Sequence, residues 1–162
     1  MPKDIVINTG PLIAIVAATE NLNILKGLYN RIIVPFEVSN EILDGGPSGF
    51  AVQKFHEAAW LDKLASPSTI GAFLHNMLDP GEASVIQTAI DRGITTVCID
   101  EAAGRRIARL NGLSVTGSIG ILIRAKKEGA NISIRVMLEN MRKHGVWLSQ
   151  AVIDTALKES GE

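Results

Sequence analysis

Apolar residues follow two alternating patterns along the chain. Short apolar runs, typical of strands buried on both faces of a sheet, occupy residues 4–7, 31–34, 95–99 and 113–116. Between these runs, apolar residues recur three or four positions apart, the spacing of a helix that packs one face on a core. The alternation predicts an α/β fold with three α/β/α layers and a central parallel sheet.

The helical segments and loops can be placed from the same pattern. Helices are predicted after residue 11, over 22–29, over 36–43, from 80 to 92, from the arginines of 105–109 to 111, from a Ser118 cap onward, over 134–144 and over 149–159. Residues 44–49 have the composition of a loop. Residues 50–77 give weaker signals, for a helix around 52–59 and a short edge strand at 60–64.

Polar residues at two of these helix starts fit known capping patterns. Asn8 or Thr9 is expected to cap the first helix, with Pro11 at its first position. Asp79 is expected to cap the helix at residue 80, and Glu82 lies three residues later, at capping-box spacing. Such spacing predicts reciprocal hydrogen bonds between residues 79 and 82.

Composition limits the class of protein. The 162 residues are 46% hydrophobic and predict a single domain over residues 1–162. No apolar run approaches the roughly 20 residues that span a bilayer, and no signal peptide is predicted, so no membrane partner is expected. Cys98, the single cysteine, lies in an apolar run and is predicted to be a buried thiol, which favours a reducing cytoplasm. The net charge of −1 means that nucleic acid would need a local basic patch.

Four oxygen-bearing side chains are candidates for chemistry. Asn8 and Asp100 each follow a predicted strand, and parallel strands bring such positions to the same edge of a sheet. Glu82 lies in the first turn of one helix, and Glu41 lies on another. A site built from oxygen ligands alone favours a hard cation such as Mg²⁺ or Mn²⁺, which activates water and polarises phosphate.

Each of these residues also has an ordinary structural explanation. Asn8, Glu82 and Asp100 fit helix caps, and Glu41 fits a solvated helix face. Taken singly, each is more often structural than functional. Their combination is what favours a metal site.

Four motifs in this order resemble the PIN domain family, metal-dependent ribonucleases that include the toxins of bacterial and archaeal toxin–antitoxin pairs. The motifs are residues 7–13, 35–42, 78–83 and 97–101. A closing segment at 115–120 is similar to that of short prokaryotic PIN-like proteins. The resemblance covers most of the chain and implies the same three-layer fold.

The resemblance also implies roles for individual residues. Glu82 and Asp100 would be ligands of one or two Mg²⁺ or Mn²⁺ ions, and Glu41 would be a ligand or the base that orients water. Thr9 and Ser118 would be supporting polar residues. A basic set would hold RNA phosphates around the site, namely Arg105, Arg106, Arg109, Arg124, Lys126 and Lys127.

Asn8 departs from the family pattern, which usually has aspartate at this catalytic and metal-binding position. A neutral amide is a weaker ligand for a hard cation. Two hypotheses therefore stand: a divalent-metal-dependent ribonuclease, weakened by Asn8, and a catalytically silent module that binds RNA or a partner protein. The expected partner is RNA. An antitoxin protein and a second copy of the chain are further candidate partners.

A phospho-receiver domain is a third class that the pattern allows, because that fold also ends parallel strands in aspartate. It requires an acidic pair just after the first strand. Residues 8–10, Asn-Thr-Gly, contain no acid. The sequence therefore disfavours this class.

Overall fold

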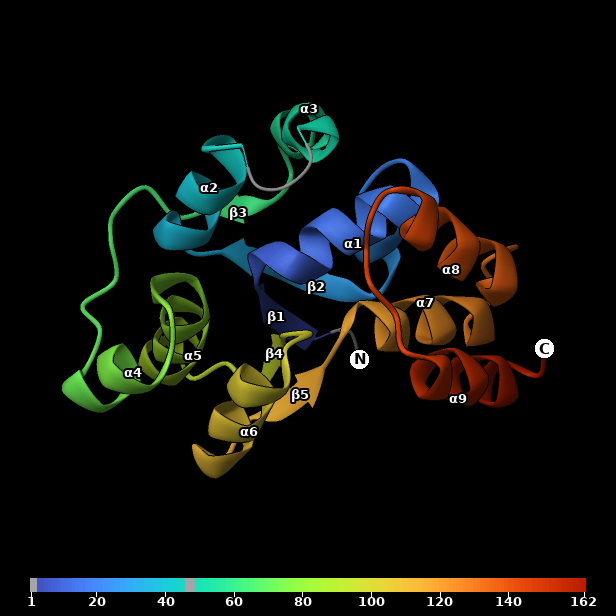
Figure 1. Cartoon of the computed structure of the whole chain (residues 1–162). Coiled ribbons are helices and arrows are strands. Elements are labelled where there is room, and N and C mark those ends of the chain that lie inside the picture. Colours follow the sequence, from blue (N-terminus) through green and yellow to red (C-terminus); the bar gives the residue numbers. More distant parts are fainter. Residues whose placement is uncertain (1–2, 46–48) are drawn as a thin grey trace.

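The computed structural model describes residues 3–45 and 49–162 (Figure 1). Its five strands are β1 (Lys3–Ile7), β2 (Tyr29–Val34), β3 (Asp62–Lys63), β4 (Thr96–Cys98) and β5 (Ser114–Thr116). Its helices are α1 (Thr9–Thr19), the 3₁₀ helix η1 (Asn23–Gly27), α2 (Phe36–Leu43), α3 (Phe50–Glu57), α4 (Ala72–Met77), α5 (Pro80–Arg92), α6 (Ala102–Leu110), α7 (Ser118–Lys127), α8 (Ile134–Lys143) and α9 (Gln150–Ser160). Strands and helices alternate as predicted.

The strands form one parallel sheet in the order β3-β2-β1-β4-β5. Helices α5 and α6 pack on β1, β4 and β5, while α1 packs with α7 and α8 in a second layer (Figure 1). The predicted three-layer α/β/α fold with a central parallel sheet is therefore confirmed. The short β3 lies at one edge of the sheet, as predicted for the segment 60–64.

Helix α1 is buried on nearly all sides, because it lies between two hydrophobic clusters. Leu12 and Ile15 belong to the core against the sheet, whereas Ala14, Ala17 and Ala18 pack against α7, α8 and α9. A helix buried all round is held firmly in place. The start of α1, which carries two predicted site residues, is therefore fixed relative to the sheet.

Several local predictions differ from the structure. Helix α1 begins at Thr9, so Pro11 is the third helical residue and not the first. Asn8 is in the capping position, but its side chain makes no capping hydrogen bond. Ser118 is the first residue of α7 and Gly117 precedes it, so Ser118 does not cap the helix. The Ser118 hydroxyl donates instead to Asp100, and Asn8 Oδ1 has no hydrogen-bond partner among the described residues.

Two longer segments also differ. The helix predicted over 22–29 is the shorter η1, and Tyr29 already belongs to β2. Helix α4 was not predicted. The predicted loop 44–49 falls partly outside the described residues, since 46–48 are not described. Cys98 is a buried free thiol as predicted, and no helix in residues 3–45 and 49–162 is long and apolar enough to cross a membrane.

Candidate metal centre

The carboxyl ends of β1 and β4 place Asn8 and Asp100 on neighbouring strand ends. Ile7 pairs with Cys98 across the two strands, and the backbone N–H of Asn8 donates to the Cys98 carbonyl at 3.1 Å. This is the predicted arrangement of the sheet edge. The side chains around it come from the starts of α1, α5, α6 and α7 and from α2.

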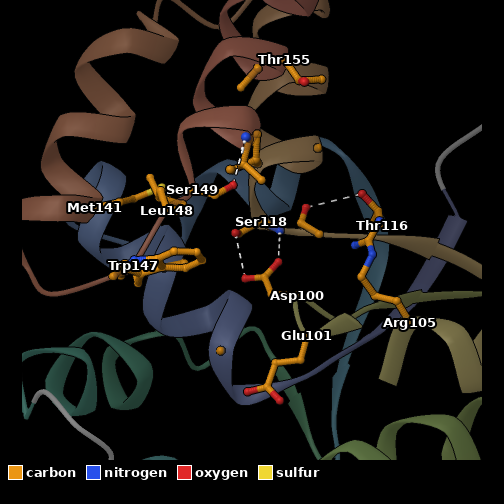
Figure 2. A pocket seen from close by; sticks show the side chains of 18 of the residues that line it. Asp100, Glu101, Arg105, Thr116, Ser118, Met141, Trp147, Leu148, Ser149 and Thr155 are labelled. Carbon is orange, nitrogen blue, oxygen red and sulfur yellow. Dashed lines mark hydrogen bonds between the residues drawn. The ribbon is translucent and has the colours of Figure 1, made fainter. Parts of the chain in front are cut away.

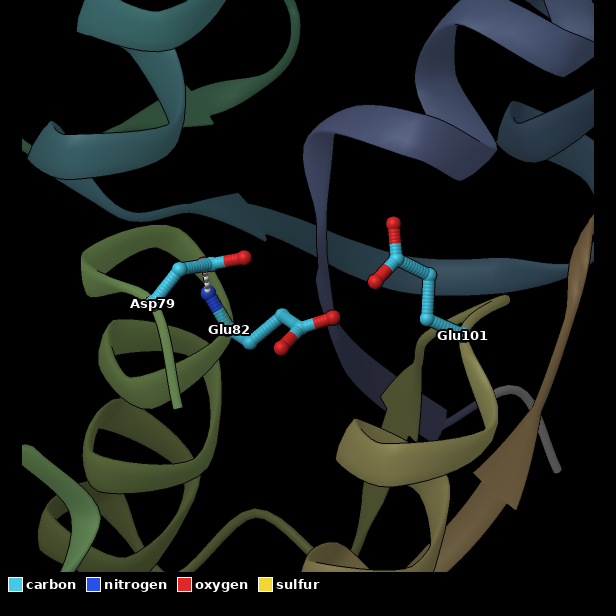
Figure 3. Close-up of side chains that lie close together, drawn as sticks. All are labelled: Asp79, Glu82 and Glu101. Carbon is cyan, nitrogen blue, oxygen red and sulfur yellow. Dashed lines mark hydrogen bonds between the residues drawn. The ribbon is translucent and has the colours of Figure 1, made fainter. Parts of the chain in front are cut away.

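Glu82 enters this edge from the first turn of α5. The Asp79 carboxylate caps the helix by accepting from the Glu82 backbone N–H at 2.9 Å. The reciprocal bond of a capping box is not formed, because Glu82 Oε1 is buried and has no hydrogen-bond partner within the described part of the chain. The Glu82 side chain, only 4% exposed, points instead toward Glu101 (Figure 3).

Three carboxylates converge here. Asp79, Glu82 and Glu101 each offer one oxygen, and these oxygens lie within 4.8 Å of one another. Glu82 is buried, whereas Asp79 and Glu101 are exposed at the mouth of the site (Figure 3). We call these three residues, together with Asn8 and Glu41, the acidic cluster.

Asn8 and Glu41 complete the cluster from the side of α1 and α2. The Thr9 hydroxyl donates to Glu41 Oε2 at 3.1 Å. Asn8 is buried, and its Oδ1 has no hydrogen-bond partner among the described residues. Gly81 lies beneath both side chains: a Cβ there would stand 2.5 Å from Glu41 Oε2 and 3.4 Å from Asn8 Oδ1. Any residue but glycine at position 81 would push Glu41 out of place.

Crowding of like charges shifts the protonation of the cluster. Burial raises the pKa of Glu82 to about 8, with further contributions from the Asp79 charge and from the hydrogen bond and charge of Glu101. Burial also raises the pKa of Glu41, against the Thr9 hydrogen bond, which lowers it. The cluster therefore disfavours its own negative charge, which a bound cation would compensate.

Asp100 is oriented differently from the prediction. Its carboxylate turns toward α7, where Oδ1 accepts from the Ser118 N–H at 2.7 Å and Oδ2 accepts from the Ser118 hydroxyl at 2.9 Å (Figure 2). Partial desolvation raises the pKa of Asp100, and the Ser118 bonds and the Arg105 charge oppose that rise. Asp100 thus lies beside the acidic cluster and keeps free lone pairs, whereas Glu101 points into it.

The predicted basic residues fall into two groups. Arg105 lies next to Asp100 and donates from Nη1 to the Ile99 carbonyl at 2.8 Å, and Arg106 and Arg109 are exposed on the same helix. The other three, Arg124, Lys126 and Lys127, lie in the last turn of α7, about 9 to 14 Å along its axis from Ser118.

Two members of this second group are also engaged elsewhere. Arg124 pairs with Glu128 at 2.7 Å and lies over the Tyr29 ring, and Lys126 pairs with Glu162 at 2.8 Å. The structure therefore does not bring this group to the predicted site.

The sequence prediction assigned no site role to Asp79 and Glu101. Both lie inside the motifs that were recognised. The sequence predicts Asp79 as a helix cap, a role that it does perform, and predicts the strand-ending Asp100, not Glu101, as the site residue. The signal that could have found Glu101 is its position just before α6, where a carboxylate faces the same sheet edge as Asn8.

Comparison with known families bears on the same residues. A family model described as a PIN domain matches residues 4–162. The chain belongs to the PIN domain family. This PIN domain has no significantly similar sequence among curated proteins. Family membership confirms the resemblance read from the motifs and is consistent with a nuclease.

The acidic cluster of this PIN domain fits a hard divalent cation. Its donors are all oxygens, the ligand type that Mg²⁺ and Mn²⁺ prefer. Two buried oxygens, Asn8 Oδ1 and Glu82 Oε1, have no other partner among residues 3–45 and 49–162. Buried polar atoms usually have a partner, so two orphans facing one cluster of acids are the pattern expected of metal ligands.

Proposed function

We propose that this PIN domain is a divalent-metal-dependent ribonuclease whose cation binds in the acidic cluster. The observation that carries the proposal is Glu82: a buried carboxylate with an unpartnered oxygen, facing Asp79 and Glu101. A carboxylate in such surroundings is costly unless a cation offsets its charge. Glu82, Glu101 and Asp79 would hold the ion, with Asn8 as a neutral fourth ligand.

Glu41 is suited to the role of base. Mg²⁺ or Mn²⁺ in the cluster would polarise the scissile phosphate and make water more acidic. Glu41 has a raised pKa, and Thr9 fixes one of its oxygens. A carboxylate with a raised pKa takes up a proton more readily, and its second oxygen is available to orient the attacking water.

The RNA backbone would follow α6. Arg106 and Arg109 are exposed on this helix, and Arg105 lies at the boundary of the site. Their positive charge would bind phosphates on either side of the cleaved one, in a chain whose net charge is only −1. Lys127 is exposed but distant, so we expect a smaller contribution from it.

The test is cleavage of a labelled single-stranded RNA with Mn²⁺, Mg²⁺ or a chelator. We expect cleavage that needs the cation and falls by 100-fold or more in Glu82→Gln and Glu101→Gln. Glu139→Gln, the same change at an exposed position on α8, serves as the matched control. If Glu101→Gln is as active as the control and Asp100→Asn is inactive, then Asp100, and not Glu101, is the metal ligand.

Asn8 favours a second candidate, a silent module that binds RNA or protein without cutting it. An amide at the end of β1 gives the cluster one negative charge fewer than an aspartate would. Binding of RNA without cleavage, together with gain of cleavage in Asn8→Asp, would select this candidate.

A toxin role with an antitoxin partner, in the cytoplasm, is a further part of the proposal. Growth arrest on expression, absent in Glu82→Gln, would support it. Size-exclusion chromatography with light scattering would test the proposed homodimer.

A further inference from the structure

A large cavity adjoins the acidic cluster on the side of α7. Its volume is about 1130 Å³, and Asp100, Thr116 and Ser118 line it at the sheet edge (Figure 2). The loop between α8 and α9 and the first turns of α9 form the opposite wall. Glu101 belongs both to this lining and to the acidic cluster, so the cavity and the proposed cation site are continuous.

Trp147 is the most unusual residue of the cavity. It is 83% exposed, although its indole is among the largest apolar side chains, and it makes no aromatic contact within the described residues. The Trp147 ring reaches into the cavity, and in the view of Figure 2 Asp100 and Ser118 lie between it and Arg105. An open indole face beside a candidate nuclease site is available for stacking.

The loop that carries Trp147 is held at both ends. The Val146 N–H donates to the Met141 carbonyl at 3.0 Å, and the Ser149 hydroxyl caps α9 by accepting from Val152 at 3.1 Å. Gly145 makes the turn with a φ of +86°, a conformation that favours glycine. The backbone of the loop is therefore held in place at both ends. Little backbone entropy is lost when a ligand stacks on the indole.

We propose that this cavity binds a nucleobase of single-stranded RNA next to the scissile phosphate, with Trp147 as the stacking platform. The proposal rests on the ribonuclease function proposed above and names how its substrate is held.

The charges of the cavity support this choice of ligand. Among the described residues, its wall carries the carboxylates of Asp100, Glu101 and Glu159 and the guanidinium of Arg105, with His144 also in the lining. A phosphate would be repelled from the interior, whereas a neutral base would not be. The phosphate therefore stays at Arg105 and at the cation proposed for the acidic cluster, whose charge offsets the carboxylates there, and the attached base enters the cavity.

The remaining lining also suits a base. Apolar side chains, among them the partly exposed Ile13 and Ile119, offer surface for a flat ring, and the hydroxyls of Thr116 and Thr155 offer polar contacts for its edge. Small-ligand sites typically measure about 300 to 1,000 Å³ and combine apolar walls with a few polar groups. The cavity has room for one base and part of the neighbouring nucleotide.

The test uses the fluorescence of Trp147. The chain has two tryptophans, and Trp60→Phe leaves Trp147 as the only indole. This variant is titrated with a short single-stranded oligoadenylate, with Ca²⁺ in place of Mg²⁺ to limit cleavage. We expect saturable quenching, because a stacked base quenches an indole. Trp147→Phe, which keeps only Trp60, should give none.

Affinity provides the second readout. Stacking of one base corresponds to a change in affinity of roughly 5- to 150-fold, so Trp147→Ala should weaken binding by about tenfold, and Trp147→Phe by less. Phe73→Ala, at an aromatic residue of α4 that is 57% exposed, is the matched control and should bind as the wild type does. A strand of abasic nucleotides should bind wild type and Trp147→Ala equally weakly.

The outcomes separate this proposal from the ribonuclease proposal. If RNA is cut with Mn²⁺ but oligoadenylate does not quench Trp147, and Trp147→Ala leaves affinity and KM unchanged, the nucleobase site is wrong and the ribonuclease stands. If oligoadenylate quenches Trp147 and no RNA is cut, the ribonuclease is wrong and the base-binding site stands. If no oligonucleotide binds, both are wrong, and a polypeptide becomes the candidate ligand of the cavity.

Discussion

Glu82 and Glu162 are two glutamates placed at helix N-termini in opposite electrostatic settings. Glu162 accepts from the Ile134 N–H at 2.6 Å, from the Ser133 hydroxyl at 2.8 Å and from Lys126 Nζ at 2.8 Å. These donors, Lys126 first, lower the pKa of Glu162 to about 2. In Glu82, burial and neighbouring carboxylates raise the pKa to about 8.

The difference shows that the helix terminus does not decide the state of a carboxylate. A helix N-terminus favours a nearby anion in both cases. The neighbours decide: donors and a lysine surround Glu162, whereas Glu82 is buried against Asp79 and Glu101. Glu162 is therefore an anion at neutral pH, whereas Glu82 without a cation beside it stays mostly protonated below about pH 8.

The largest expected effect is on cation binding. Glu82→Gln keeps the shape of the side chain and removes the buried charge, so we expect Mn²⁺ affinity to fall by 100-fold or more. Isothermal titration calorimetry measures this directly. Glu162→Gln is the same change at the contrasting site and should leave Mn²⁺ affinity unaltered. Equal Mn²⁺ affinity in wild type and Glu82→Gln would contradict the assignment of the acidic cluster.

The fold was largely predictable because the two hydrophobic periodicities are strong. The apolar runs at 4–7, 31–34 and 95–99 correspond to β1, β2 and β4, and the periodic segments around them correspond to long helices. The misses are short elements. The 3₁₀ helix η1 and the six-residue α4 are too short to show a helical period, so tertiary packing decides them.

The position of the site in the fold was predictable from the sequence, but the side chains that form it were less so. The sheet topology brings Asn8 and residues 100–101 to one edge, and this follows from the order of the strands. Which of two adjacent acids faces the cluster depends on side-chain direction, and that depends on Ser118, a residue 18 positions from Asp100. Sequence spacing does not contain that contact.

Asn8→Asp adds one more negative charge to the acidic cluster. A charge pair about 4 Å apart, at an effective dielectric near 20, corresponds to on the order of 4 kcal/mol before desolvation. Desolvation and repulsion from the neighbouring carboxylates cancel much of this, so we expect Mn²⁺ to bind about tenfold more tightly and RNA to be cut faster. The double variant Asn8→Asp with Glu82→Gln should lose both gains. Native cleavage as fast as that of Asn8→Asp would show that the amide is an adequate ligand.

Gly81→Ala should disturb the cluster without disturbing the fold. The new Cβ would stand 2.5 Å from Glu41 Oε2, the far end of a long side chain that can turn aside, and alanine favours a helix over glycine by about 1 kcal/mol. We expect Glu41 to be displaced, Mn²⁺ affinity to fall by up to about tenfold, and Tm to stay within about 3 °C of wild type. Gly71→Ala, where the nearest atom would be 3.5 Å away, is the control. Unchanged cleavage in Gly81→Ala would exclude Glu41 as the base.

The pH dependence of stability in the absence of metal tests the raised pKa of Glu82. The folded pKa of Glu82, about 8, lies above its ordinary value of 4.5, so its protonated form stabilises the fold fully below pH 4.5. That contribution is lost as pH rises from 4.5 through 8. In a chelator we expect Tm to fall by roughly 5 °C or more across this range, and less in Glu82→Gln. Excess Mn²⁺ should restore Tm at pH 8; the same slope in both proteins would contradict the raised pKa.

Glu162→Gln should give the smallest effect and the opposite pH dependence. The folded pKa of Glu162, about 2, lies below its ordinary value of 4.5, so its anion stabilises the fold above pH 4.5 and that contribution is lost as pH falls toward 2. Removing the charge weakens the bonds to Lys126 and to the start of α8, so we expect a Tm lower by a few degrees at pH 7. We also expect the Tm of this variant to fall less than that of wild type as pH drops from 4.5 toward 2. Glu159→Gln, an exposed glutamate three residues away, should change neither.

The two glutamates make stability depend on pH in opposite directions: the contribution of Glu162 rises with pH and that of Glu82 falls. Near pH 4.5 to 5, Glu162 is ionised and Glu82 is still protonated. Their joint contribution to the stability of the metal-free protein is therefore greatest there, and excess Mn²⁺ should move the maximum of Tm to higher pH. Thermal scans of both single variants and of the double variant measure this. A Glu162→Gln variant whose Tm maximum keeps the wild-type response to Mn²⁺ would show that the two sites act independently.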